Sequence, residues 1–328
     1  MKKIIAPSRR GFCAGITALT AAPAILRAQG SWPKAGTIRM IIPFPPAGAT
    51  DIIGRVLAEG LSQRWGTQII VENKPGAGGN IGVDQAARAA PDGNTLLVAS
   101  VGMATNPYLY KSLAYDPIRD FDPVSLLAMV PNIMVVPKNS PATDLADFVA
   151  RATAEPGKFT FASSGIGTSL HLSGELFNKL TGAKMVHVPY KGSGDAKNDL
   201  VAGRFDCMFD NITSVLPLAR EGVIRALGIT TAKPSPLAPE LKPIAGAVPG
   251  FDVSSWFALF TPARVPAEIA ARIAADTQAV LGEKAVADKL ATLGGEIVAS
   301  TPGEMRAFLQ AESAKWGALI RELGISAG

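Results

Sequence analysis

The sequence predicts an α/β fold of two domains, each a mostly parallel sheet flanked by helices. The chain has 328 residues, 48% of them hydrophobic, which is sufficient for a large core and more than one domain. Short apolar runs alternate with helical stretches across residues 37–100, and the same order returns across residues 158–229. A proline-rich connector at 231–250 precedes a strand at 254–260 that we expect to return to the first domain.

The first 28 residues have the composition of an export signal. Basic residues precede a mildly apolar stretch at 14–26, and Ala28 stands at a typical cleavage point. The pair Arg9 and Arg10, preceded by serine, matches the twin-arginine pattern, so both that route and the Sec route stay open. No later stretch holds the roughly 20 apolar residues of a membrane helix. We therefore expect an exported protein.

The composition of the mature chain excludes several classes of function. Five of the 32 basic residues and no acidic residue lie in the first 28, so their removal leaves 27 basic and 27 acidic residues. A neutral chain with 6% aromatic residues lacks the electrostatic footprint of a nucleic-acid partner. Cys207 is then the single cysteine, which excludes an intrachain disulfide, and we expect a buried thiol.

The first strand, loop and helix form the unit around which the chain is organised. Residues 37–42 are an apolar run typical of a buried strand, and the apolar positions of residues 52–61 share one helical face. In the loop between them, Gly48 allows close approach of a ligand, and Thr50 or Asp51 is placed to cap the helix. A helix N-terminus suits a small anion, although a capped turn without a ligand would have the same sequence.

The rest of the first domain repeats this plan. We expect a strand at 68–72, a glycine-rich loop at 73–80 followed by a helix to residue 90, and a third strand at 95–100. Because the carboxyl ends of parallel strands meet at one edge of a sheet, the three following loops should line one binding crevice.

The second domain is expected to begin near two strands at 124–130 and 132–136, separated by Pro131. Thr143 should cap a helix to residue 154. Further strands are predicted at 158–162, 184–188, 205–209 and 223–229, and further helices to residue 180 and at 195–201, 267–281 and 283–293. A last helix begins at Thr301 with a capping box, and we interpret its apolar face as packing.

Signals of catalysis are scarce. The chain has only two histidines and none of the common metal, nucleotide or nucleophile motifs. The glycine loops at 76–81 and 165–170 lack the third glycine of a dinucleotide fingerprint. A triad of Ser164, His171 and Asp210 would make an exported serine hydrolase acting on a small ester or amide, but nothing in the spacing supports it. We expect no cofactor and no metal.

Small donors at helix starts are the chemistry that the chain does offer. Backbone N–H groups and hydroxyls can hold a carboxylate without a lysine or arginine, each bond contributing about 1 kcal/mol net. The candidate donors are Gly48, Thr50, Gly78, Gly79, Ser100, Thr105, Ser163, Ser164, Thr168 and Ser169.

Six ordered motifs carry a resemblance to a known family. They are PFPPAGATD, ENKPGAGGNIG, APDGNTLL, FASSGIGTSLHL, VPYKGSGDA and RFDCMFDN. With these motifs, nearly all of the chain after residue 28 resembles the Bug receptors, the TctC-type periplasmic solute-binding proteins of tripartite tricarboxylate transporters.

The resemblance implies a two-lobed Venus flytrap that closes over a small carboxylate, with residues 29–127 and 250–328 in lobe 1 and residues 128–249 in lobe 2. It also implies, as partners of a monomer, TctA/TctB-like transporter subunits or a sensor. The implied ligand residues of lobe 1 are Phe44, Ala47, Gly48, Thr50 and Asp51, with Gly78, Gly79 and Asn80. Those of lobe 2 are Ser163, Ser164, Gly167, Thr168, Ser169 and His171, with Tyr190 and Asp210 on the rim.

Three of these residues leave alternatives open. Family members usually carry glycine where this chain has Ala47, whose methyl group either narrows a water-mediated site or is tolerated if φ stays negative. His171 donates a hydrogen bond to a ligand or a neighbouring loop, or is structural. Asp210 either suits a ligand with an amino or hydroxyl group or orients loop donors.

Overall fold

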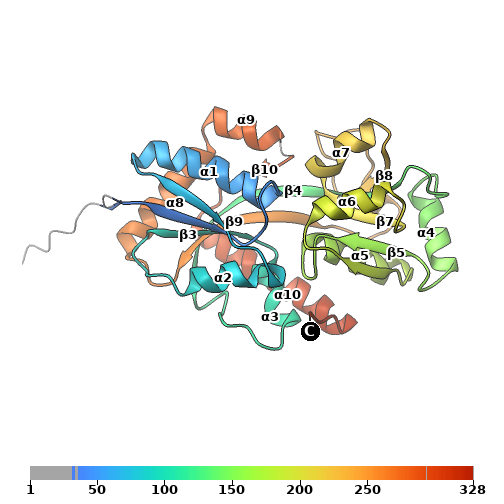
Figure 1. The fold of residues 1–328 in the computed structure, drawn as a ribbon, viewed down its shortest axis with the longest axis horizontal. Coiled ribbons are helices and arrows are strands. Elements are labelled where there is room, and N and C mark those ends of the chain that lie inside the picture. Colours follow the sequence, from blue (N-terminus) through green and yellow to red (C-terminus); the bar gives the residue numbers. More distant parts are fainter. Residues whose placement is uncertain (1–31, 34–35, 293, 328) are drawn as a thin grey trace, which may run out of the picture. The chain divides into compact units, whose positions relative to one another are not determined.

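The computed structural model describes residues 32–33, 36–292 and 294–327. Its strands join in the order β2-β1-β3-β9-β4-β7-β5-β6, with β8 and β10 also paired to β4. Helices flank these strands (Figure 1). The predicted α/β class is confirmed.

The first three strands are parallel, and each leads into a helix at the same edge of the sheet. The strands are β1 (Ile38–Ile42), β2 (Ile69–Asn73) and β3 (Thr95–Ser100). The helices that follow them are α1 (Ala49–Trp65), the short η1 (Ala77–Gly79) with α2 (Asn80–Ala87), and α3 (Gly102–Leu109). The three predicted loops therefore lie along one edge, whereas α3 was not predicted.

The second group of strands repeats this arrangement, since β5 pairs in parallel with β6 and β7. The strands are β5 (Thr160–Ser163), β6 (Val186–Pro189) and β7 (Cys207–Asn211). The helices are α4 (Leu145–Ala154) before β5, then α5 (Ser169–Thr181), α6 (Ser193–Val201) and α7 (Ile212–Arg220), each after one strand. The sequence did not predict α7.

One long strand joins the two groups. The two strands predicted around Pro131 are a single strand, β4 (Phe121–Pro137), so that prediction was wrong. β4 pairs with β9 (Ser254–Pro262) up to Pro131 and with β7 and β8 (Ile224–Ile229) from Asn132 onward. Pro131 lacks an N–H, and it lies where the strand changes neighbours, so the ladder continues on either side of it. Figure 1 shows β4 and β9 running side by side.

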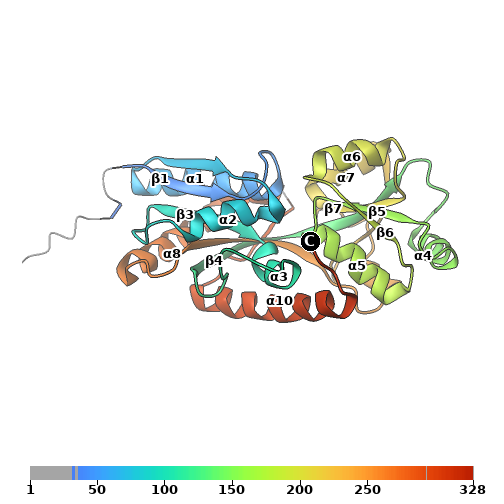
Figure 2. The same ribbon diagram turned by 60° about the horizontal axis from the view of Figure 1, so that its bottom comes forward.

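The C-terminal part packs back onto the first group. It contains η2 (Ile244–Gly246) before β9, then α8 (Ala267–Leu281), α9 (Lys284–Thr292), β10 (Glu296–Ile297) and α10 (Pro302–Leu323). The capping box at Thr301 is present. α10 packs its apolar face against α3 and β4 (Figure 2), as predicted.

Two predicted helix caps were wrong. α1 begins after Gly48, with no side-chain cap, because the Asp51 carboxylate is held by other donors. α4 is capped by Asp144, whose side chain accepts from the Asp147 amide, and not by Thr143.

Two properties of the described residues bear on the class of protein. None of their helices has the length and apolarity needed to cross a bilayer. Cys207 is a buried free thiol, as predicted, and its burial raises the pKa well above the ordinary value.

Candidate functional site

Asp51 fixes the loop between β1 and α1. It is 3% exposed, and its carboxylate accepts from the Ala47 amide at 2.9 Å, Arg55 Nε at 2.9 Å and Asn73 Nδ2 at 2.8 Å. Burial opposes ionisation, but these hydrogen bonds outweigh it and hold the pKa of Asp51 below its usual value. Asn73 also donates to the Phe44 carbonyl at 3.0 Å. Asp51 therefore organises the loop, and Thr50 beside it is buried.

Ala47 adopts a backbone conformation that favours glycine. Its φ is 65°, so the condition of a negative φ is not met, and the residue is exposed. Gly48, which follows, has an ordinary φ of −81° and serves as the N-cap of α1. No side chain of the described residues caps this helix, so the first N–H groups of α1 are available to another acceptor.

The glycine-rich loop before α2 lies against this first loop. A Cβ built on Gly79 would lie 3.4 Å from Pro43 Cβ and 3.6 Å from Phe44 Cζ. Gly79 is the N-cap of α2, has a φ of 93°, and again no side chain caps the helix. Both helices thus begin after a glycine N-cap, and the loop before one lies against the loop before the other, which favours an anion near these helix starts.

The loop between β5 and α5 is held by its own side chains. Thr168 caps α5, accepting from the His171 amide at 3.3 Å, and donates to the Gly165 carbonyl at 2.8 Å. The Gly167 amide donates to His171 Nδ1 at 3.2 Å, and Ser163 Oγ accepts from the Gly165 amide at 3.1 Å. The buried Ser163 and His171 therefore shape this loop from within.

The rings of the two histidines lie close together, tilted by 30°. Their ring centroids are 4.0 Å apart, and His187 also stacks on Phe161. Burial, together with the neighbouring His171, lowers the pKa of His187 to about 3. His187 Nε2 lies 2.7 Å from Ser163 Oγ. His171 accepts a hydrogen bond from its own loop, so its contacts favour the structural alternative.

The two groups of loops meet at α3. Thr105 Oγ1 is fully buried and donates to the Gly167 carbonyl at 3.0 Å. A Cβ built on Gly167 would lie 2.4 Å from Leu109 Cδ1, and one built on Gly78 would lie 3.6 Å from the Ile166 carbonyl oxygen. Thr105 was among the predicted donors, whereas Asn106 and Leu109 were not predicted, because the helix that carries them was not predicted.

The remaining predicted residues form two groups: those whose side chains bond other parts of the fold, and those that keep some exposure along the loops. Ser169, Tyr190 and Asp210 are engaged elsewhere: Ser169 with Ser255 at 2.6 Å, and the Tyr190 hydroxyl with Asp199 at 2.7 Å. Those that keep some exposure along the loops are Phe44, Ala47, Gly48, Gly78, Asn80, Ser100, Ser164 and Thr168.

Asp210 is buried and serves other side chains. It accepts from Ser193 at 2.9 Å, Ser214 at 2.8 Å and the Asn211 amide at 2.8 Å, and its burial raises the pKa. These contacts favour the alternative in which it orients loop donors. Within the described part of the chain, no hydrogen bond joins Asp210 to His171 or His171 to Ser164, so the triad is not assembled. No group of three or more potential metal ligands occurs there either.

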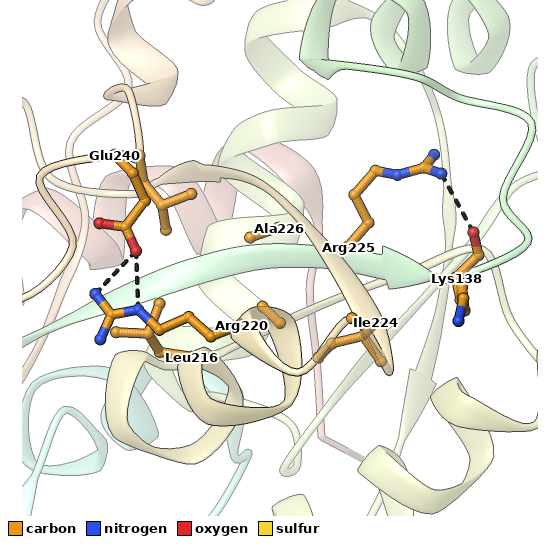
Figure 3. Close-up of a pocket in the computed structure, with 10 residues that line it drawn as sticks. Lys138, Leu216, Arg220, Ile224, Arg225, Ala226 and Glu240 are labelled. Carbon is orange, nitrogen blue, oxygen red and sulfur yellow. Dashed lines mark hydrogen bonds and ion pairs between the residues drawn. The ribbon is translucent and has the colours of Figure 1, made fainter.

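A pocket of about 500 Å³ lies away from these loops, between α7, β8 and the segment that contains Glu240 (Figure 3). Its two arginines are already engaged. Arg220 pairs with Glu240, and Arg225 donates to the carbonyls of Ser140 and Ala142. We therefore place the candidate anion site at the loops, where the first N–H groups of α1 and α2 have no side-chain partner among the described residues.

The chain matches known proteins over most of its length. A sequence model described as "Tripartite tricarboxylate transporter family receptor" (TctC) matches residues 53–325. Protein BugT of Bordetella pertussis is 36% identical over 313 residues, which are 94% of this chain and 96% of that protein.

Two solved structures share the fold over nearly their whole length. R. palustris Rpa4515 with adipate has a TM-score of 0.85 at 36% identity, covering 90% of this chain and 99% of that one. MatC from Rhodopseudomonas palustris with bound malate has a TM-score of 0.80 at 31% identity, covering 87% and 98%.

Proposed function

This chain belongs to the TctC family of tripartite tricarboxylate transporter receptors, and from that premise we propose that it binds a small carboxylate and delivers it to a membrane transporter. No reaction is catalysed in this account. The adipate and malate in the two related structures support a carboxylate ligand.

One observation in the structure carries the proposal. α1 and α2 each begin after a glycine N-cap without a side-chain cap, and the loops before them lie against each other. Thr105 on α3 contacts the facing Gly167 loop. A carboxylate placed there would accept hydrogen bonds from backbone N–H groups at two helix N-termini. The loop that contains Ser164 and Thr168 would cover it from the second lobe.

We infer that lobe 1 contains residues 29–127 and 250–328 and that lobe 2 contains residues 128–249. Both β4 and the connection into β9 pass between the two groups of strands, which makes them the candidate hinge. Closure around the ligand would present a new surface to TctA/TctB-like subunits or to a sensor. The receptor would act as a monomer.

The proposed export signal, residues 1–28, lies outside the described residues. Two further similar structures, a periplasmic transporter at 37% identity and the periplasmic binding protein BugD at 30% identity, support a periplasmic location. Expression of the full chain in a Gram-negative host, followed by N-terminal sequencing of the periplasmic fraction, should give Gln29 as the first residue. Retention of the intact chain in the cytoplasm would contradict the signal.

A thermal-shift screen tests the function. The mature protein is heated with di- and tricarboxylates, aromatic acids and acidic amino acids, and each hit is repeated with the corresponding neutral amide. A ligand at about 100 times its dissociation constant adds roughly 2.7 kcal/mol of stability. A panel in which no carboxylate raises the midpoint, or in which the amides act equally, would contradict the proposal.

A further inference from the structure

Asn80 at the start of α2, Asn106 within α3 and Tyr115 in the segment after α3 form a hydrogen-bonded cluster, which we call the Asn80 cluster. Asn80 Oδ1 accepts from Asn106 Nδ2 at 2.6 Å and from the Tyr115 hydroxyl at 2.6 Å. Asn106 Nδ2 also lies 3.4 Å from the Tyr115 oxygen. Asn80 is the first residue of α2, directly after Gly78 and Gly79. The cluster therefore stands at the edge where the candidate site lies.

The cluster sets which end of the Asn80 amide is free. Two donors occupy the two lone pairs of its Oδ1. Its Nδ2 has no hydrogen bond to any described residue and remains accessible to solvent. Burial raises the pKa of Tyr115 to about 12, so the hydroxyl keeps the proton that it donates. Asn80 thus presents two N–H donors outward.

The described orientation of the Asn80 amide leaves one buried oxygen of Asn106 without a partner among the described residues. Asn106 Oδ1 is buried, in a residue that is 1% exposed, and it would lie 3.4 Å from a Cβ built on Gly167 of the facing loop. Turning both amides over would give Asn106 Oδ1 a donor, but it would turn the carbonyl oxygen of Asn80 outward instead. An anion beside Asn80 stabilises the first orientation and opposes the second.

We propose that Tyr115 and Asn106 are positioning residues that hold the amide of Asn80, a ligand residue implied by the family resemblance, with its Nδ2 towards the bound carboxylate. The inference rests on the proposed function. It goes beyond the proposed function by assigning a role to Tyr115 and Asn106, two residues that were not predicted to contact the ligand. It also predicts preference for a carboxylate over a ligand that presents a donor at this point.

An isosteric change of Asn80 tests the polarity. With adipate as the probe, Asn80→Asp should weaken binding at pH 7.5 by about 10- to 100-fold, because an oxygen replaces the N–H donor. Relative to wild type at the same pH, the affinity should recover as the pH is lowered and the introduced carboxylate takes up a proton, and this comparison cancels the protonation of adipate itself. Binding that is unchanged at pH 7.5, or a loss that does not depend on pH, would overturn the proposed contact.

A double-mutant cycle tests the positioning role. Tyr115→Phe should weaken adipate binding by about fivefold in the wild-type background and by less than twofold in an Asn80→Ala background, since it acts through Asn80. Tyr108→Phe is the matched control, because it removes a hydroxyl that bonds Ser313 on α10. Equal losses in both backgrounds would overturn the role of Tyr115.

A measurement without ligand separates this inference from the proposed function. The side-chain amide signals of Asn80, assigned by their absence in Asn80→Asp, should shift in Tyr115→Phe and stay in place in Tyr108→Phe. If the wild-type protein binds adipate but the Asn80 amide signals do not shift in Tyr115→Phe, the positioning role is wrong and the proposed receptor function is unaffected. If the signals respond while no carboxylate binds, the receptor function and the ligand contact both fail.

Discussion

Thr105 on α3 donates a hydrogen bond of 3.0 Å to the carbonyl of Gly167, a residue 62 positions later in the sequence and in the facing loop. Both residues are buried. The same hydroxyl also lies 3.2 Å from the Val101 carbonyl of its own helix turn. This bond is a direct link between the two halves of the proposed site.

We expect Thr105→Val to weaken ligand binding by about three- to tenfold, because it removes a bond worth about 1 kcal/mol and leaves the Gly167 carbonyl unpaired. Isothermal titration with a carboxylate found in the thermal-shift screen measures the effect. Thr105→Ser keeps the hydroxyl and should bind within about twofold of wild type. Equal affinities for the valine and wild-type proteins would contradict a role for this bond in the bound state.

Gly167 offers a second test, with a control at the same backbone angle. Gly167 and Gly157 both have a φ of 82°, but a Cβ on Gly157 would meet nothing within 4 Å, whereas one on Gly167 would meet Leu109. Each alanine variant should lower the free energy of unfolding by about 1 kcal/mol through backbone strain.

Only Gly167→Ala should also weaken ligand binding, since its methyl group presses on α3. Leu109→Ala makes room for that methyl group and should restore part of the affinity. Loss of binding in Gly157→Ala as well would show that backbone strain, and not the contact with α3, is responsible.

Ala47→Gly should stabilise the protein by roughly 0.5–1 kcal/mol. Ala47 has a φ of 65°, a region that costs a residue with a Cβ about 1–2 kcal/mol, and the larger conformational entropy of glycine in the unfolded chain offsets part of the gain. Denaturant unfolding gives the difference. Gly66→Ala is the reverse control, since Gly66 has a φ of 60° with nothing within 4 Å. Destabilisation by Ala47→Gly would contradict the described conformation.

His187 should make stability fall with decreasing pH. Its pKa of about 3 lies below the ordinary 6.5. Below pH 6.5, His187 therefore takes up a proton in the unfolded chain, whereas in the folded chain it stays neutral down to about pH 3. Stability is fully present above pH 6.5 and declines across this interval, by at most about 1.4 kcal/mol per pH unit from this group.

Proton NMR checks this directly, because the chain contains only two histidines. The ring signals of His187, assigned by their loss in His187→Gln, should not titrate between pH 8 and 4.5. The His187→Gln protein should also show a flatter decline of stability over the same range. A midpoint near 6.5 for His187 would contradict its burial against His171.

Local sequence patterns were sufficient for most of the fold. Alternating apolar runs and glycine-rich loops predicted parallel strands, and those loops lie at one edge because parallel strands end there. α3 and α7 were missed because each is short and contains a proline, Pro107 or Pro217, which weakens the helical pattern. Pro131 led to the wrong prediction of two strands in place of β4, because a proline usually interrupts a strand but is tolerated where the strand changes partners.

The candidate site was less predictable than the fold. Sequence could indicate Asn80 and Asp51 as site residues, but their roles depend on distant partners: Asn80 on Tyr115, and Asp51 on Asn73. Hydrogen bonds over 20 or more positions leave no local signal. Ala47 shows the same limit, because its φ is fixed by the loop as a whole and its amide is held by Asp51.

Hydrogen–deuterium exchange with and without a bound dicarboxylate tests the central claim most directly. If a carboxylate is held between the two loops, the amides of residues 47–51 and 164–168 should both gain protection, and the matched diamide should protect neither. Protection confined to one loop, or to the segments around Arg220 and Arg225 that line the pocket in Figure 3, would contradict a site between the two loops.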